Sequence, residues 1–243
     1  MIGIFKGLKK LSLIEFPGKV CAIGFTGGCN FRCPWCYVRD LVLNYDSLPD
    51  IKGRQILRFL ESRKRWIDAF VVSGGEPTIH DWLPTMLAKV KDKGFLTGLE
   101  TNGSNPKMLS QIINDGLIDY VEMDVKAPLT KPSLYMKSIG MEKGIDRAKL
   151  LEAIGTSIRI LKKGKVNYAF RTTVVPTLIK DTDVVEIAKE LRGAKKYYLQ
   201  QFKPMDSLID KKFSKLRPYS SRQLINIRDK CRKYVTDVEI RGL

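Results

Sequence analysis

The chain of 243 residues is predicted to be an α/β protein, built as a partial (βα)6 barrel of parallel strands. Short runs of β-branched and aromatic residues alternate with longer amphipathic stretches, which is the pattern of repeated strand–helix units. About five or six such units fit the length, and a hydrophobic content of 44% can fill a substantial core. Because no internal repeat or low-complexity linker divides the sequence, residues 1–243 are expected to form a single domain.

The predicted strands are apolar runs bounded by turn-forming residues or by the start of a helix. The first run leads directly into a cluster of cysteines, and the later ones recur at the intervals expected of βα units. Strands are predicted at Val20–Phe25, Ala69–Ser73, Leu96–Glu100, Tyr120–Asp124, Tyr168–Thr173, Tyr197–Gln200 and Asp237–Arg241.

The predicted helices follow from apolar spacing and from end signals. In the first helix Ile56 and Leu60 share the buried side. Gly94 ends the second helix, and Asn105 caps the third with Pro106 at its first helical position. Helices are predicted at Lys52–Lys64, Leu83–Lys93, Pro106–Gly116, Asp146–Lys163, Asp183–Arg192 and Ser221–Tyr234. The less regular stretches, expected as surface loops over a site, are Ala127–Gly144 and Phe202–Tyr219.

Three cysteines, Cys29, Cys33 and Cys36, lie within eight residues in the pattern CxxxCxxC. A structural zinc site takes four Cys or His ligands, and an ordinary electron-transfer [4Fe-4S] cluster takes four cysteines. Three thiolates on a four-iron cluster would leave one iron open to a substrate. A zinc site or a chance clustering of cysteines is the alternative interpretation of the same residues.

The remaining Cys and His residues do not complete a four-ligand set. Cys21 lies inside an apolar run and Cys231 on a predicted helix, so both are interpreted as small buried side chains. His80, the one histidine, is interpreted as a loop or cap residue. The sequence therefore favours an incomplete ligand set.

Polar residues recur immediately after the predicted strands, at the edge where parallel α/β sheets bind their ligands. After the second strand, Gly74 and Gly75 would let the backbone approach a ligand, and Glu76 would offer a carboxylate at the rim. The alternative is a plain turn. Later strands are followed by Glu100 and Asn102, by Asp124 and Lys126, and by Gln201, with Arg171 near the end of the fifth. A surface ion pair is the alternative interpretation of Asp124 and Lys126.

The cysteine motif with its Pro34-Trp35 insert, followed about 40 residues later by Gly-Gly-Glu-Pro, resembles the radical S-adenosylmethionine (SAM) superfamily. The resemblance covers nearly the whole chain. Within the superfamily the chain looks most like the activating proteins of anaerobic ribonucleoside-triphosphate reductase and of pyruvate formate-lyase. The resemblance implies a partial (βα)6 barrel, a [4Fe-4S] cluster on the three cysteines, and SAM chelated to the open iron.

The same resemblance implies roles for individual residues. The residues expected to carry the reaction are Cys29, Cys33 and Cys36, which would bind the cluster, and Lys126, which would bind the SAM carboxylate. The SAM site is expected to be completed by Trp35, Tyr37, Gly74, Gly75, Glu76, Pro77, Glu100, Asn102, Asp124, Gln201 and Arg171, which would face SAM. The Gly-Gly-Glu-Pro turn would bind the SAM ammonium group, Asp124 would be an orienting acid, and Gln201 would reach the nucleoside.

The expected reaction is one-electron cleavage of SAM to methionine and a 5′-deoxyadenosyl radical, with an electron from a reductant such as ferredoxin or flavodoxin. The leading substrate is a glycine Cα–H on a glycyl radical enzyme. One departure weakens that choice, because the family usually places His-Asn after the third cysteine and this chain has Tyr37-Val38. Radical modification of RNA or a small metabolite is the alternative, and a non-catalytic, metal-bearing nucleic-acid-binding module is an alternative of another class.

The net charge of +17 is compatible with an acidic protein partner or RNA. The lysines and arginines are nevertheless spread over nearly every predicted helix, so a solvated surface accounts for them as well. The first residues lack the apolar core of a signal peptide, and no run approaches the roughly 18 apolar residues of a membrane span. A cytoplasmic protein without membrane contact is expected, because clustered free thiols require a reducing compartment.

Overall fold

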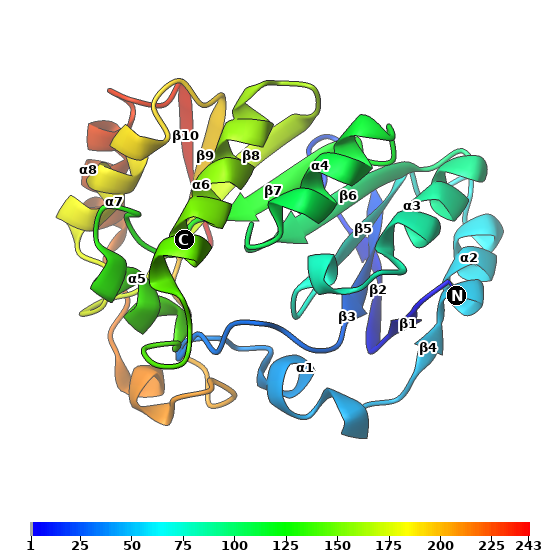
Figure 1. Ribbon diagram of the computed structural model, residues 1–243, viewed down its shortest axis with the longest axis horizontal. Coiled ribbons are helices and arrows are strands. Elements are labelled where there is room, and N and C mark those ends of the chain that lie inside the picture. Colours follow the sequence, from blue (N-terminus) through cyan, green and yellow to red (C-terminus); the bar gives the residue numbers. More distant parts are fainter. Residues whose placement is uncertain (1) are drawn as a thin grey trace.

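The computed structural model describes residues 2–243, and its centre is an eight-stranded sheet (Figure 1). The strands of this sheet are β2 (Gly7–Ser12), β3 (Cys21–Thr26), β5 (Ala69–Gly74), β6 (Leu96–Thr101), β7 (Tyr120–Asp124), β8 (Asn167–Val174), β9 (Lys196–Gln201) and β10 (Asp237–Arg241). Every predicted strand is confirmed within one residue at each end. Two short strands, β1 (Ile4–Phe5) and β4 (Ile51–Lys52), pair separately in an antiparallel ladder.

The sheet order is β10-β9-β8-β7-β6-β5-β3-β2, so spatial order follows chain order. From β3 to β10 every neighbouring pair is parallel, while β2 runs antiparallel to β3 at one edge. Successive βα units with crossovers of one hand produce this order. The predicted partial barrel of parallel strands is confirmed, with β2 and β10 as its two unjoined edges.

The helices include α3, α4 and α6, which Figure 1 shows packed over one face of the sheet, and α1, which it shows apart from that face. They are α1 (Arg39–Leu43), α2 (Gly53–Ser62), α3 (Leu83–Asp92), α4 (Pro106–Asn114), α5 (Pro132–Ile139), α6 (Arg147–Lys162), α7 (Asp181–Glu190) and α8 (Ser221–Cys231), with short 3-10 turns η1 (Tyr45–Ser47), η2 (Pro77–Ile79) and η3 (Lys211–Lys215). All six predicted helices are present. Their apolar residues and the alternate strand residues form the main core.

The expectation of an irregular stretch at Ala127–Gly144 is wrong, because this stretch contains α5. The helix has Pro132 in its first turn, and Gly140 ends it in a left-handed conformation with φ 65°. Its eight residues span about two turns, too few for a helical period to stand out. The side chain of Tyr135 is fully buried, which anchors this short helix to the core.

The other face of the sheet, called here the inner face, has an apolar half and a polar half. Its apolar floor is a small core of Phe16, Cys21, Ile23, Ala69, Val71, Tyr120, Ala169 and Tyr198. Phe16 comes from the turn between β2 and β3, and its ring lies 5.4 Å from that of Tyr120. The floor lies toward the amino-terminal ends of the strands, and the polar half lies toward their carboxyl ends.

No helix within residues 2–243 is long and apolar enough to cross a bilayer.

Candidate active site

The three cysteines lie on the loop that follows β3, and hydrogen bonds hold this cysteine loop from two sides. The N–H of Arg32 donates to the carbonyl of Ile139 at 2.8 Å, which joins the loop to the end of α5. On the other side the N–H of Asp210 donates to the carbonyl of Pro34, also at 2.8 Å. Figure 1 shows the loop running from β3 toward α5 and the segment before η3. Both stretches predicted as surface loops therefore support the cysteines.

All three thiols are free, with Cys33 buried and Cys29 and Cys36 half-buried. Burial raises the pKa of Cys33 to about 12 and that of Cys29 to about 12, and the charge of Lys126 opposes the rise in both. A buried thiol of this kind loses its proton when a metal cation binds to the sulfur in place of the proton. The chemistry of these three sulfur atoms thus suits a bound metal group better than it suits free thiolates.

The turn after β5 lies directly against the backbone that leads into Cys29. A Cβ atom at Gly75 would lie 1.8 Å from the carbonyl oxygen of Gly28, which is impossible without displacement. At Gly74, φ is 122° and a Cβ would lie 2.3 Å from the backbone nitrogen of Thr26. Both positions therefore require glycine. The Gly-Gly-Glu-Pro turn therefore packs its backbone directly against the cysteine loop.

The sequence predicted that Glu76 lies at the rim of the site. The structure shows it buried instead, with 1% of its surface exposed. Its Oε1 accepts hydrogen bonds from the N–H and the hydroxyl of Thr78 and from the hydroxyl of Thr101. Its Oε2 accepts from the N–H of Asn102 at 2.7 Å. Burial raises the pKa of Glu76, and these hydrogen bonds oppose the rise. The carboxylate joins the turn after β5 to the loop after β6.

Asn102 connects that same loop to the cysteines. Its Nδ2 donates to Oδ1 of Asn30 at 2.9 Å, and Nδ2 of Asn30 donates to the hydroxyl of Ser104 at 2.7 Å. Asn30 lies between the first two cysteines and was not among the predicted site residues. An amide inside a ligand loop is a signal that sequence analysis could have used.

Asp124 and Lys126 form an ion pair of 2.7 Å, with side chains 17% and 11% exposed, so the surface-pair alternative is wrong. Burial alone would raise the pKa of Asp124, but Arg171 and Lys126 outweigh it and hold that pKa well below its usual range. The Lys126 ammonium also lies 4.9 Å from the centre of the Trp35 ring. Lys126 is thereby placed between a carboxylate and the aromatic residue of the cysteine motif.

Arg171 is the centre of a larger group of charges on the inner face. Its Nε lies 2.6 Å from Asp124, and its Nη1 lies 2.6 Å from Glu122 and 3.4 Å from Glu100. Glu122 in turn bonds Arg241 of the last strand at 2.8 Å. The inner-face network is defined as Glu100, Glu122, Asp124, Lys126, Arg171 and Arg241. Glu122 and Arg241 were not predicted, although Glu122 is two residues before Asp124 on the same strand and so shares its face.

Gln201 is not brought to the inner-face network. Along β9 it shares its side of the strand with Tyr197 and Leu199, which are buried in the helix-covered core. Its Nε2 donates to the carbonyl of Tyr219 at 2.6 Å, and its Oε1 is buried without a partner in the described chain. Its neighbour Gln200 lies on the opposite side of β9, which is the inner face of the sheet.

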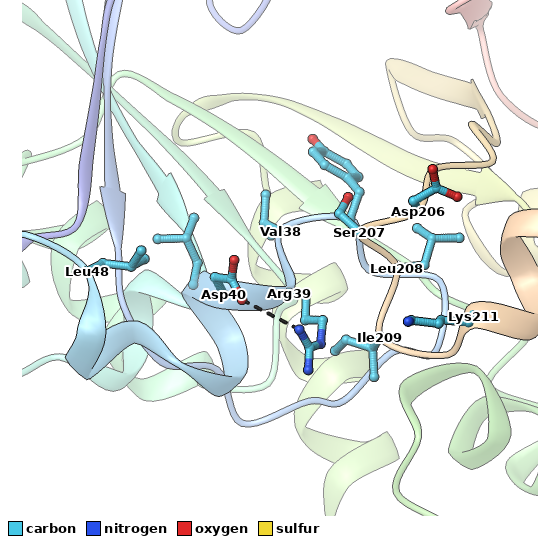
Figure 2. A pocket seen from close by; sticks show the side chains of 11 residues that line it. Val38, Arg39, Asp40, Leu48, Asp206, Ser207, Leu208, Ile209 and Lys211 are labelled. Atoms are coloured by element: carbon cyan, nitrogen blue, oxygen red, sulfur yellow. Dashed lines mark ion pairs between the residues drawn. The ribbon is translucent and has the colours of Figure 1, made fainter.

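Tyr37 lies with its neighbours beside a cavity of about 470 Å³, shown in Figure 2. One wall is the segment after the third cysteine, where Arg39 and Asp40 lie 3.8 Å apart. The other wall is 206–209 with Lys211, and the N–H of Ile209 donates to the carbonyl of Cys36. The Tyr37 side chain is 60% exposed. The positions that depart from the family pattern thus lie at a solvent-accessible hollow next to the third cysteine.

The residues present fit a cluster and SAM on three observations. Three thiols share one loop, two glycines let the turn after β5 pack directly against that loop, and the buried Trp35 has an indole N–H without a partner in residues 2–243. Within the same residues, no three Cys, His, Asp or Glu side chains are grouped tightly enough to hold a single metal ion. A bound polar group would give the indole N–H of Trp35 a hydrogen-bond partner, and a bound metal group would take the three thiols as thiolate ligands.

The fold and this site define an enzyme of the radical SAM type, and the comparison with protein families agrees. The chain belongs to the radical SAM superfamily, whose family model matches residues 23–191. Enzymes of this superfamily bind a [4Fe-4S] cluster and SAM, so both predicted cofactors are confirmed at the level of the family. The residues that hold them remain predictions.

Among similar sequences, a candidate glycyl-radical enzyme activating enzyme of Methanocaldococcus jannaschii is 33% identical over 100% of this chain and 98% of that protein. A 7-carboxy-7-deazaguanine synthase of Neisseria meningitidis serogroup B is 37% identical, but over 42% of this chain and 41% of that protein. The whole-length match supports the predicted group within the superfamily.

Solved structures show the same fold at low identity. Streptococcus suis SuiB superposes with a TM-score of 0.66 and 11% identity, over 90% of this chain and 48% of SuiB. QueE from Escherichia coli gives a TM-score of 0.57 and 14% identity, over 99% of this chain and 94% of QueE. The mostly parallel sheet of this chain is therefore the radical SAM fold.

Proposed function

We propose that this radical SAM enzyme generates a glycyl radical on a partner protein. The observation that carries the proposal is the match to a candidate glycyl-radical enzyme activating enzyme over 100% of this chain and 98% of that protein. The net charge of +17 adds support, since it favours encounter with an acidic protein. An anaerobic ribonucleotide reductase is the leading partner, and a ferredoxin or flavodoxin is the expected reductant.

The roles of the residues follow from their placement. Cys29, Cys33 and Cys36 would hold the cluster, which when bound would supply the electron for cleavage of SAM to methionine and a 5′-deoxyadenosyl radical. Lys126 would donate hydrogen bonds to the SAM carboxylate from its position beside Trp35. Because the carboxylate of Glu76 already accepts four hydrogen bonds from the protein, we assign recognition of the SAM ammonium group to the backbone of its turn.

The substrate that gives up a hydrogen atom would approach through the cavity beside Tyr37, because this cavity opens next to the third cysteine. Its lining combines aliphatic side chains such as Leu208 with both acidic and basic groups such as Asp40 and Lys211. A mixed lining of this kind suits a polypeptide segment, which presents apolar and polar groups together. We therefore place the glycine-bearing loop of the partner there.

A small metabolite is the second candidate substrate, and two observations favour it. Tyr37-Val38 departs from the activating-enzyme pattern at the edge of the cavity. The partial match to a 7-carboxy-7-deazaguanine synthase covers 42% of the chain. RNA modification has only the basic surface in its favour. Family membership sets the non-catalytic nucleic-acid-binding alternative aside.

We also propose that residues 1–243 act as one domain in the cytoplasm. The eight-stranded sheet draws strands from the first and last tenths of the chain, and its charged network joins β7 to β10 through Glu122 and Arg241. Three unpaired cysteines in one loop require a reducing compartment to stay unpaired.

The test is anaerobic reconstitution with iron, sulfide, SAM, a reductant and the glycyl radical enzyme from the same genome. The expected result is an electron paramagnetic resonance doublet from a glycyl radical on the partner, absent with the Cys36→Ala variant. A signal with the wild type and none with this variant would establish the role. If SAM is cleaved at the same rate with and without the partner and no radical forms, the activating role is wrong and a metabolite becomes the leading substrate.

A further inference from the structure

Arg241 lies on the last strand of the sheet and reaches the candidate SAM site through one carboxylate. Its Nη1 bonds Oε2 of Glu122 at 2.8 Å, and its guanidinium lies 3.3 Å from the centre of the Tyr198 ring. The other oxygen of Glu122 bonds Arg171 at 2.6 Å. Glu122 is 1% exposed, so both oxygens are held out of water between two arginines.

The inner-face network is balanced in charge. Its three carboxylates are those of Glu100, Glu122 and Asp124, and its three cations are Lys126, Arg171 and Arg241. The side chains are between 1% and 19% exposed, so each charge acts on the others with little screening by solvent. Removing any one charge would leave the buried network with an excess of the opposite sign.

Lys126 and Arg171 differ in how many of their N–H groups are still free to donate a hydrogen bond. Arg171 spends Nε and Nη2 on Asp124 and Nη1 on Glu122. The ammonium of Lys126 has three N–H groups and a single carboxylate partner, Asp124. Between Lys126 and Arg171, Lys126 is therefore the one with N–H groups left to donate to an incoming carboxylate, and Arg171 holds Asp124 in place beside it.

We propose that Arg241 is a positioning residue which, through Glu122, keeps the network neutral so that Lys126 can bind the carboxylate of SAM. The inference rests on the proposed SAM site and adds to it a residue at the opposite edge of the sheet. Without Arg241 the network carries an extra negative charge, which repels a second carboxylate. Without the charge of Glu122 it carries an extra positive charge, which attracts one.

The test measures equilibrium binding of SAM and of decarboxylated SAM, which lacks the carboxylate, to reconstituted protein with its iron content checked. For Arg241→Gln, the ratio of the two affinities is expected to fall on the order of tenfold, because one buried charge is lost. The affinity for decarboxylated SAM is expected to stay within about twofold. A general loss of structure would lower both affinities and leave the ratio unchanged.

Two further variants complete the test. For Glu122→Gln the ratio is expected to rise, and this opposite sign decides the question if Arg241→Gln does not fold. Lys230→Gln is the matched control, since Lys230 is exposed and pairs with Asp181 on the far surface, and its ratio should equal that of the wild type. If neither network variant changes the ratio while the wild type prefers SAM, this inference is wrong and the proposed SAM site stands. If the wild type shows no preference, the proposed site itself is wrong.

Discussion

The apolar floor and the charged network of the inner face lie on the same strands but are stabilised in different ways. On β7, Tyr120 belongs to the apolar floor, whereas Glu122 and Asp124, two and four residues further on, belong to the charged network. On β8, Ala169 and Arg171 divide in the same way. The floor is stabilised by the removal of apolar surface from water, which makes few demands on geometry. The network depends on every charge having its partner, so one missing side chain disturbs the others.

The largest effect is expected at the thiols above the network. Changing Cys29, Cys33 or Cys36 to Ala should abolish the binding of about four iron and four sulfide per chain, because the cysteine loop contains no fourth thiol that could replace the lost ligand. Iron and acid-labile sulfide are measured after anaerobic reconstitution. Cys21→Ala and Cys231→Ala are matched controls, since both thiols are fully buried in apolar cores. Loss of iron in these controls alone would contradict the assignment.

In the floor, Phe16→Ala should destabilise the protein without changing its affinity for SAM. Removing a buried phenylalanine costs about 3–5 kcal/mol of unfolding free energy. Denaturant unfolding measures the loss, and Leu13→Ala in the same turn, where the side chain is 67% exposed, should change stability by less than about 0.5 kcal/mol. SAM affinity of folded Phe16→Ala should match the wild type. A large fall in that affinity would mean that floor and network are not separate.

In the network, Lys126→Ala should weaken SAM binding while iron content stays at the wild-type level. A charge-assisted hydrogen bond is worth about 1.5–3 kcal/mol, hence roughly ten- to hundredfold in affinity. Isothermal titration of the reconstituted protein measures the change. Lys131→Ala is the control, because that side chain is 46% exposed and pairs with Asp183 of α7. Equal affinity in Lys126→Ala and in the control would place the SAM carboxylate elsewhere.

The smallest effect is expected at the boundary between the two halves. The hydroxyl of Tyr120 lies 3.4 Å from Oε2 of Glu122, a long contact that Arg241 already dominates at 2.8 Å. Tyr120→Phe should therefore change stability by less than about 1 kcal/mol and leave SAM affinity within twofold. Thermal unfolding and ligand titration test both values. A loss comparable to that of Phe16→Ala would show that the hydroxyl belongs to the network.

Local patterns in the sequence predicted most of the sheet and the cysteine loop. The strands were predictable because most are short runs rich in β-branched and aromatic residues, and the cysteines because their spacing is itself the signal. The parts that escaped prediction depend on partners distant in sequence. Edge strand β2, Gly7–Ser12, contains two lysines and pairs on one side, so no apolar run marks it. Arg241 gains its role from Glu122, 119 residues earlier.

The correction at Glu76 has a similar cause. Its position after β5 predicted a carboxylate near the ligand, but the sequence does not show that Thr78, Thr101 and Asn102 converge on it. Burial with four hydrogen bonds is a property of the folded arrangement. The same holds for α5, whose eight residues become recognisable as a helix once Tyr135 is buried beneath the cysteine loop.

The most direct test of the account is the product analysis of reconstituted, chemically reduced protein incubated with SAM under anaerobic conditions. We predict that 5′-deoxyadenosine and methionine form in equal amounts, that about four iron and four sulfide are bound per chain, and that both products disappear with Cys36→Ala. Stoichiometric zinc without iron, together with intact SAM after incubation, would contradict the central claim.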